Sequence, residues 1–319
     1  MIDAVIPAHE KDIDTVGLCA EYIKKNVVGI RDVYVVSKDK LTDNAKWVSE
    51  DIFPFTLEKV SDIIGKHKKT CWYYAGLIQQ TAALVVPNLA DHVLICDSDT
   101  IFTRPTKFID KNNKTLFNVS YDVPSHVNDH PYFEYMEKLV PGLCKQSKYS
   151  GIVHHMPVRK NVLQSLHNEV EKIHDMPFWK ASLSVTLQDY KTVNKNCHAT
   201  GQGMMSTYDL YFNYVTKYFP DTMVIDPKKS ILVYKEKFGV DGFLEHNVPS
   251  RTNLYGNVKV FSDEEQNKFK FEDIKDSMRH IANRVGELGW SAVTFQNHTR
   301  VGSEENGKIN DEYIRKHVS

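Results

Sequence analysis

Short apolar runs alternate with amphipathic stretches over the first 100 residues of the chain. Residues 4–7 and 33–36 are short apolar runs typical of strands, and residues 92–96 form a continuous apolar run of the kind found in a strand buried on both faces. Between them, residues 13–26 and 71–86 carry apolar side chains at helical spacing. This alternation of strand and helix patterns predicts an α/β fold with a mainly parallel sheet flanked by helices.

The rest of the chain is less regular. Strand patterns are found near residues 117–121, 152–156, 222–225, 231–234 and 292–295, and helical patterns near residues 132–139, 160–173 and 205–218. Residues 251–275 are polar and read as loops. There is no internal repeat and no clear linker, so we expect a single domain over residues 1–319. Its predicted parts are residues 1–105, residues 106–250, and a C-terminal elaboration over residues 251–319.

Two carboxylates follow the most apolar of these strands. Asp97-Ser98-Asp99 comes directly after the run that ends at Cys96. Ligands in open α/β sheets bind beyond the carboxyl ends of the strands, where the polar residues 9–12 and 37–39 are also expected. Carboxylates suit a hard cation such as Mg²⁺ or Mn²⁺ that also binds phosphate oxygens. An ordinary turn after a strand is the alternative, because a D-x-D triplet is weakly specific by itself.

Composition narrows the class of protein. The chain has 319 residues, of which 41% are hydrophobic and 25% charged, as in soluble globular proteins. A net charge of -1 and a pI near 6.9 lack the basic footprint of a nucleic-acid-binding protein. The five cysteines are scattered, which favours reduced thiols. No apolar run approaches the roughly 18 residues of a membrane span, and no signal-peptide pattern opens the chain. We therefore expect a soluble, cytoplasmic protein without a membrane span.

The order of these segments resembles the GT-A class of glycosyltransferases. A strand that ends at Pro7, a polar loop, a helix, a second strand and an apolar strand closing on Asp97-Ser98-Asp99 carry this likeness. Further segments resemble the poorly characterised DUF6492 family of glycosyltransferases over residues 2 to about 300. They are Trp72-Tyr73-Tyr74 with Gln79-Gln80, His154-His155-Met156, Ser206-Thr207-Tyr208-Asp209 with Tyr211, and Asn297-His298-Thr299-Arg300.

The resemblance implies a function and a site. A GT-A enzyme transfers a sugar from a nucleotide-diphospho-sugar, by default a UDP-sugar, to a glycan or glycoprotein acceptor with the help of Mn²⁺ or Mg²⁺. Residues 1–105 would form the nucleotide-binding half and residues 106–250 the acceptor half. Similar enzymes are encoded by large DNA viruses, in which case the host cytoplasm would be the location.

The same resemblance gives roles to residues on the donor side. Asp99 would bind the metal directly, and Asp97 would bind the donor ribose or the outer shell of the metal. His298 would supply a further metal ligand, and Arg300 would bind phosphate through its guanidinium fork.

The first loop and one helix complete the expected donor site. The loop with Pro7, His9 and Asp12 would pass beneath the base and ribose, although Asp12 is equally suited to cap the following helix. Gln80 would lie near the metal, although residues on such a helix usually belong to the core.

An inverting transfer needs a general base for the acceptor hydroxyl. Asp209 is our preferred candidate, with Asp122 and Asp129 as alternatives, while Thr207 departs from the glutamate of the family pattern and weakens this assignment. A retaining transfer would need no such base. Tyr208 and His155 are expected to bind the acceptor. Neighbouring residues on a strand face opposite ways, so only one of His154 and His155 should meet a ligand.

Two other classes of function compete with a transferase. A GT-A scaffold can bind a nucleotide or glycan without turning it over, because a fold does not fix a function. A nucleotidyltransferase also uses carboxylates and Mg²⁺, but the loop after the first strand has no glycine to cradle a triphosphate. Glycoside hydrolysis needs carboxylates on both sides of the sugar, which two aspartates at one strand end do not provide.

Overall fold

The structure is a computed structural model of the whole chain. It describes residues 1–64, 70–120, 131–193, 205–228, 230–234, 243–246, 274–287 and 289–296. The predicted site residues Asp122, Asp129, His298 and Arg300 lie outside these ranges, so their roles stay predictions.

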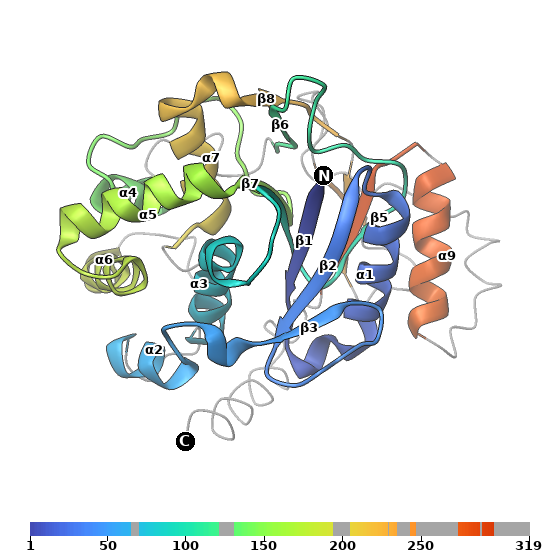
Figure 1. Cartoon of the computed structure of the whole chain (residues 1–319), viewed down its shortest axis with the longest axis horizontal. Helices are drawn as coiled ribbons and strands as arrows, with labels where there is room; N and C mark the ends of the chain where they lie inside the picture. The colour runs from blue at the N-terminus through green and yellow to red at the C-terminus, as the bar shows by residue number, and fades with distance from the viewer. Residues whose placement is uncertain are drawn as a thin grey trace.

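A mainly parallel sheet forms the centre of the molecule. Its strands lie in the order β3 (Lys46–Ser49), β2 (Ile30–Ser37), β1 (Ile2–Pro7), β4 (His92–Cys96) and β7 (His155–Arg159). Neighbouring strands are parallel except β4 and β7, which are antiparallel. Figure 1 shows this sheet between helices on both sides. The prediction of a mixed, mainly parallel sheet flanked by helices is therefore confirmed.

Alternation along the strands explains the two helical layers. Val5, Val93 and Ile95 point to one face of the sheet, where they join a large core with α3 (Thr70–Val85). Residues one step along, such as Ala4 and Leu94, point to the other face and pack with α1 (Ile13–Asn26). Because both faces are covered, the strands read as continuous apolar runs. The remaining helices on the α3 side are α2 (Leu57–Ile64), α4 (Pro131–Leu139), α5 (Lys160–His174), α6 (Phe178–Val193) and α7 (Thr207–Tyr218).

A second sheet pairs strands from residues 230–296 with a strand from the first half of the chain. It has the order β10 (Phe243–His246), β9 (Ser230–Tyr234), β11 (Ala292–Gln296) and β5 (Thr100–Phe102). The helix α9 (Ile274–Glu287) lies beside α1 (Figure 1), where Arg279 forms a bidentate ion pair with Glu21. The described part of the predicted C-terminal elaboration therefore completes the core. β6 (Thr115–Phe117) and β8 (Met223–Ile225) form a separate parallel pair.

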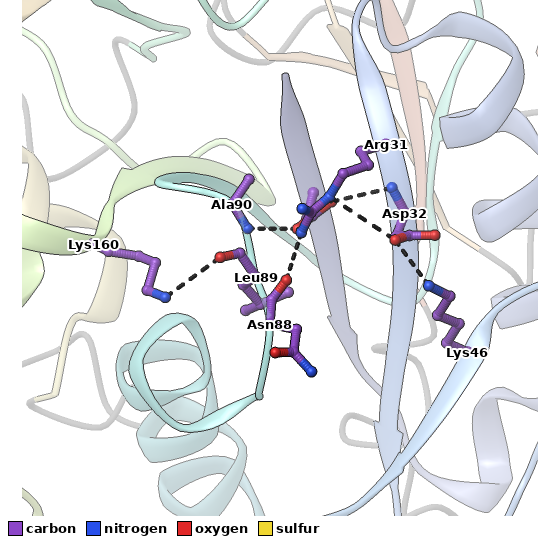
Figure 2. A network of polar contacts seen from close by, with 8 residues as sticks. Arg31, Asp32, Lys46, Asn88, Leu89, Ala90 and Lys160 are labelled. Atoms are coloured by element: carbon purple, nitrogen blue, oxygen red, sulfur yellow. Dashed lines mark hydrogen bonds and ion pairs between the residues drawn. The ribbon is translucent and has the colours of Figure 1, made fainter.

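A polar network fixes the amino end of the central sheet (Figure 2). Asp3 on β1 is fully buried, and its carboxylate accepts hydrogen bonds from the Arg31 side chain and from the backbone N–H groups of Asp32 and Ala90. Arg31 also donates to the Asn88 carbonyl. One carboxylate thus ties β1 to β2 and to the turn before β4. These contacts lie at the amino-terminal ends of the strands, opposite to their carboxyl ends.

Several sequence expectations need correction. The strand predicted at residues 152–156 begins only at His155, and the strand predicted at residues 117–121 ends at Phe117. The elements β3, β5, β10, α2, α6 and α9 were not predicted. Short segments such as β3, β5, β10 and α2 give little signal, whereas α9 has a helical pattern that went unnoticed. Among the described residues, no helix is both long enough and apolar enough to cross a membrane.

Candidate functional site

The D-x-D triplet lies at the carboxyl end of β4, in the turn that leads to β5. Its backbone is fixed on three sides. The Asp97 N–H donates to the His154 carbonyl at 3.0 Å, and the Thr100 N–H donates to the Asp97 carbonyl at 3.2 Å. The Phe295 N–H of β11 donates to the Asp99 carbonyl at 2.9 Å. These bonds set where the two carboxylates begin, at the edge where open α/β sheets bind ligands.

Three side chains hold the Asp97 carboxylate. Its Oδ1 accepts hydrogen bonds from Gln79 Nε2, at 2.8 Å, and from the Tyr208 hydroxyl. Its Oδ2 lies 3.1 Å from Nδ1 of His154. A carboxylate offers about four lone-pair positions. With three of them used, Asp97 can accept about one further hydrogen bond or metal contact. We call Asp97 with Gln79, Tyr208 and His154 the Asp97 network.

His154 reaches Asp97 because its backbone has left the extended conformation. Its φ of +62° lies in the left-handed region, just before β7 begins at His155. This region is uncommon for a residue other than glycine and costs conformational energy of the order of 1 kcal/mol. The resulting kink lets both the carbonyl and the imidazole of His154 face Asp97.

Asp99 is in a different position from Asp97. Its side chain is only partly exposed, and none of the described residues donates a hydrogen bond to its carboxylate. Burial, together with the nearby negative charge of Asp97, raises the pKa of Asp99 from 3.8 to about 7. His154 and Lys11 oppose this rise, whereas Asp12 adds to it. A cation beside Asp99 would relieve the same repulsion.

The donor set fits a hard divalent cation only in part. Within the described ranges, no three His, Cys, Asp or Glu side chains come together as a preformed metal cage. Asp99 and the remaining lone pair of Asp97 are two oxygen donors, and Mg²⁺ or Mn²⁺ commonly uses few protein ligands alongside phosphate and water. The third predicted ligand, His298, lies outside the described residues.

The loop after β1 lies next to Asp99. Pro7 is the last residue of β1, and His9 caps the short 3-10 helix η1 (Glu10–Asp12). The Asp12 carboxylate accepts a hydrogen bond from the His9 N–H at 3.0 Å and makes no side-chain cap of α1. Asp12 therefore stands at the N-cap position of α1, as the alternative expected, but without a capping hydrogen bond from its side chain. The hydrogen bond between His9 and Asp12 holds the loop together. The charges of Lys11 and Asp12 lie close enough to Asp99 to influence its pKa.

Asp209 and Tyr208, which are neighbours on α7, have different surroundings. Tyr208 is buried and donates to Asp97, so it belongs to the candidate site. Asp209 is fully buried, and its Oδ1 accepts hydrogen bonds from the Ser150 hydroxyl at 3.0 Å and from the Gly151 N–H at 2.7 Å. These contacts tie α7 to the loop before β7. A fully buried carboxylate is poorly placed to reach an acceptor hydroxyl.

At two predicted positions, Gln80 and His155, the preceding residue is the one that contacts Asp97. Gln80 is buried and its carbonyl accepts from His167, whereas the preceding Gln79 reaches Asp97. His155 is buried against the rings of Phe102 and Phe108, at centroid distances of 5.1 and 5.5 Å. Burial lowers the pKa of His155 from 6.5 to about 3. A buried, neutral histidine does not suit acceptor binding, and the histidine at the site is His154.

Sequence reasoning also missed Thr207 and Lys11. The Thr207 hydroxyl donates to Gln79 Oε1 at 3.1 Å, and Lys11 influences Asp99 by its charge. The helical pattern of residues 71–86 could have favoured Gln79, because Trp72, Ala75 and Gln79 share the less buried face of α3. No local signal could have shown that the start of α7 faces the same place.

Comparisons with known proteins give only a remote similarity. No protein-family model matches the chain, and no curated protein matches it. Among solved structures, the chain is similar to the galactosyltransferase LgtC in complex with donor and acceptor sugar analogs, at 10% identity and a TM-score of 0.39, over 97% of this chain and 95% of that one. It is also similar to an active-site mutant of LgtC, at 11% identity and a TM-score of 0.39, over 97% of this chain and 94% of that one. At this level, the similarity assigns no residue and no activity.

Proposed function

We propose that this protein is a metal-dependent glycosyltransferase of the GT-A type. It would transfer a sugar from a nucleotide-diphospho-sugar, by default a UDP-sugar, to a glycan or glycoprotein acceptor. The observation that carries the proposal is the pairing of two unlike carboxylates at the carboxyl edge of a parallel sheet. Asp97 is held by three side chains, whereas the partly buried Asp99 has no hydrogen-bond donor among the described residues.

The two carboxylates would divide the work of donor binding. Asp99 would hold Mn²⁺ or Mg²⁺, and His298 remains the candidate for a further ligand. When bound, the cation would supply a positive charge that stabilises the departing diphosphate. Asp97 keeps about one open acceptor position, which suits a ribose hydroxyl or a metal-bound water. Lys11 adds a positive charge on the loop side of Asp99, where phosphate oxygens would lie.

The proposal leaves the general base unassigned. Asp209 is fully buried and occupied by the Ser150 and Gly151 donors, so its role in catalysis gains no support. Asp122 and Asp129 remain candidates outside the described residues. A retaining reaction would need no such base.

Donor binding is the first test. We would screen UDP-, GDP- and dTDP-sugars with Mn²⁺ or Mg²⁺, measuring the thermal shift and the release of nucleoside diphosphate. We expect binding and release that depend on the metal. Metal-dependent binding with no release to any acceptor tried would favour the alternative of a nucleotide-binding or glycan-binding module, and release of pyrophosphate from a nucleoside triphosphate would favour a nucleotidyltransferase. The absence of any metal-dependent binding would refute the proposal.

A matched pair of variants tests the location of the site. Asp99→Asn should abolish metal-dependent donor binding, because the amide replaces the carboxylate that faces the cation. Asp91→Asn makes the same chemical change at an exposed position just before β4, at the other end of that strand. It should bind the donor like the wild type. Equal binding by both variants would remove Asp99 from the site.

A further inference from the structure

The Gln79 side chain is held at both ends of its amide group. Its Nε2 lies 2.8 Å from Asp97 Oδ1 and 3.2 Å from the Tyr208 hydroxyl. Its Oε1 accepts a hydrogen bond from the Thr207 hydroxyl at 3.1 Å. The amide group of a glutamine can rotate by about 180°, which exchanges the positions of its NH2 donor and its oxygen acceptor. After such a turn the amide oxygen would face the Asp97 carboxylate, and two acceptors would repel each other.

The helices α3 and α7 approach each other closely next to Gln79 and Thr207. Gly76 lies one turn before Gln79 on α3, and its missing side chain leaves room for the start of α7. A methyl group at Gly76 would come within 3.1 Å of both Met205 Sδ and Thr207 Cγ2. The Ser206 hydroxyl accepts from the Asp209 N–H and caps α7, which fixes the turn that carries Thr207.

We propose that Thr207 and Gln79 are positioning residues of the donor site, with Thr207 acting on Asp97 through the Gln79 amide. The proposal rests on the proposed function, since it assumes that the metal and the donor bind at Asp97 and Asp99. The Asp97 carboxylate can only accept and so turns the Gln79 N–H group toward itself, and the Thr207 hydroxyl anchors the other end of the amide by donating to Oε1. The Asp97 carboxylate then keeps one orientation and one open acceptor position for the donor.

The consequence is a specific effect on donor affinity. Without the Thr207 hydroxyl the amide loses the hydrogen bond at its oxygen end, so its contact with Asp97 is held less firmly and Asp97 is correctly placed for only part of the time. Thr207→Val should raise the KM for the nucleotide-sugar about fivefold, the effect expected from one hydrogen bond between neutral groups, with a change in kcat of less than about twofold. Thr207→Ser keeps the hydroxyl and should restore the wild-type KM.

A threonine on the same helix provides the control. The Thr216 hydroxyl donates to the Phe212 carbonyl within α7 at 2.7 Å and makes no hydrogen bond to the Asp97 network. Thr216→Val removes the same atom from the same helix and should leave the KM unchanged. A purely structural role of Thr207 would lower the thermal midpoint of Thr207→Val but leave the KM of the folded enzyme unchanged, and that result would overturn the proposal.

A double-mutant cycle separates this inference from the proposed function. In a Gln79→Leu background the amide is absent, so the further change Thr207→Val should have no additional effect on the Kd for Mn²⁺ and UDP. The full fivefold effect in that background would overturn the proposal. If the wild type bound neither Mn²⁺ nor UDP, the proposed function would be lost. The cycle would then be measured by urea unfolding, where additive effects of the two substitutions would overturn the coupling of Thr207 to Gln79.

Discussion

Asp97 and Asp99 are two positions apart in the chain, but the protein surrounds their carboxylates differently. Asp97 accepts from Gln79 and Tyr208 and lies 3.1 Å from His154 Nδ1. Asp99 has no hydrogen-bond donor among the described residues. The first carboxylate is thus tied into the folded structure, whereas the second makes no such hydrogen bond. Their substitution should therefore have opposite effects on stability.

We predict that Asp97→Asn destabilises the metal-free protein, whereas Asp99→Asn does not. An amide at position 97 would turn one N–H group toward donors that need an acceptor, at a cost of about 2 kcal/mol in the free energy of unfolding. An amide at position 99 removes a charge that burial disfavours. Urea unfolding in the presence of a chelator measures both. A larger loss of stability for Asp99→Asn would contradict this view.

His167 predicts a pH dependence of stability. It is buried, stacked on Phe178 with ring centroids 3.8 Å apart, and burial lowers its pKa from 6.5 to about 4. The stabilising contribution of the neutral ring is complete above pH 6.5. This contribution is lost as the pH falls from 6.5 toward 4. In that range His167 is protonated in the unfolded chain but stays neutral in the folded chain.

The expected size of this effect is about 3 kcal/mol at most between pH 6.5 and pH 4. Replacement by glutamine removes the titrating group. The free energy of unfolding of His167→Gln, measured in urea across this range, should fall less steeply than that of the wild type. Parallel curves for the two proteins would show that His167 titrates normally in the folded state.

The residue scale also shows why part of the site escaped sequence analysis. The D-x-D triplet could be predicted because a buried strand leads directly to it. Helical spacing could have favoured Gln79 over Gln80, but His154 could not be separated from His155, since that choice depends on the local conformation of the backbone. For His154 the decisive feature is a φ of +62°, which ends the predicted strand pattern one residue before β7.

At the scale of elements, the close approach of α7 to the loop before β7 is decisive. Gly151 lies where any side chain would collide with α7. A methyl group there would come within 2.6 Å of Phe212 Cβ and 3.0 Å of the Tyr208 carbonyl oxygen. The Gly151 N–H also donates to Asp209. The loop that carries His154 and the helix that carries Tyr208 are therefore closely packed at Gly151.

We predict that Gly151→Ala destabilises the protein by about 1–3 kcal/mol, because a packed interface must separate to admit the methyl group. Gly76→Ala is the comparison. Its methyl group would meet the flexible Met205 side chain and Thr207 Cγ2, both at 3.1 Å, so its cost should be smaller. Thermal unfolding of the two variants decides the order. A less stable Gly76→Ala would place the tighter contact between α3 and α7.

The elements themselves were predictable where the pattern was long. Helices α1, α3, α5 and α7 and strands β1, β2 and β4 follow from apolar periodicity, which reports burial on one or both faces. The edge strand β3 is short and half exposed, so it shows no clear alternation. Pairing between β5 and β11 was not predictable either, because it depends on tertiary contacts between distant segments.

At the scale of the whole molecule, the amino ends and the carboxyl ends of the strands in the central sheet differ in their polar contacts. The amino edge is fixed by the buried Asp3 with Arg31 and backbone N–H groups, as in Figure 2. The carboxyl edge carries the D-x-D triplet. We therefore predict that Asp3→Asn lowers stability without changing the site.

Asp3→Asn should cost about 3 kcal/mol in the free energy of unfolding, because charged hydrogen bonds to a buried group are lost. The Kd for Mn²⁺ and UDP, measured well below the unfolding temperature, should equal that of the wild type. An altered Kd together with an intact fold would show that the two edges are coupled.

The hydrogen bond between the Phe295 N–H and the Asp99 carbonyl joins residues that are about 200 positions apart. On the ribosome, the D-x-D segment would emerge long before β11 is synthesised, so β5 would wait without its partner strand. A nascent chain that stopped short of β11 would have most of its parallel sheet but an unsupported D-x-D turn. The D-x-D turn would therefore reach its final position only after β11 has been synthesised.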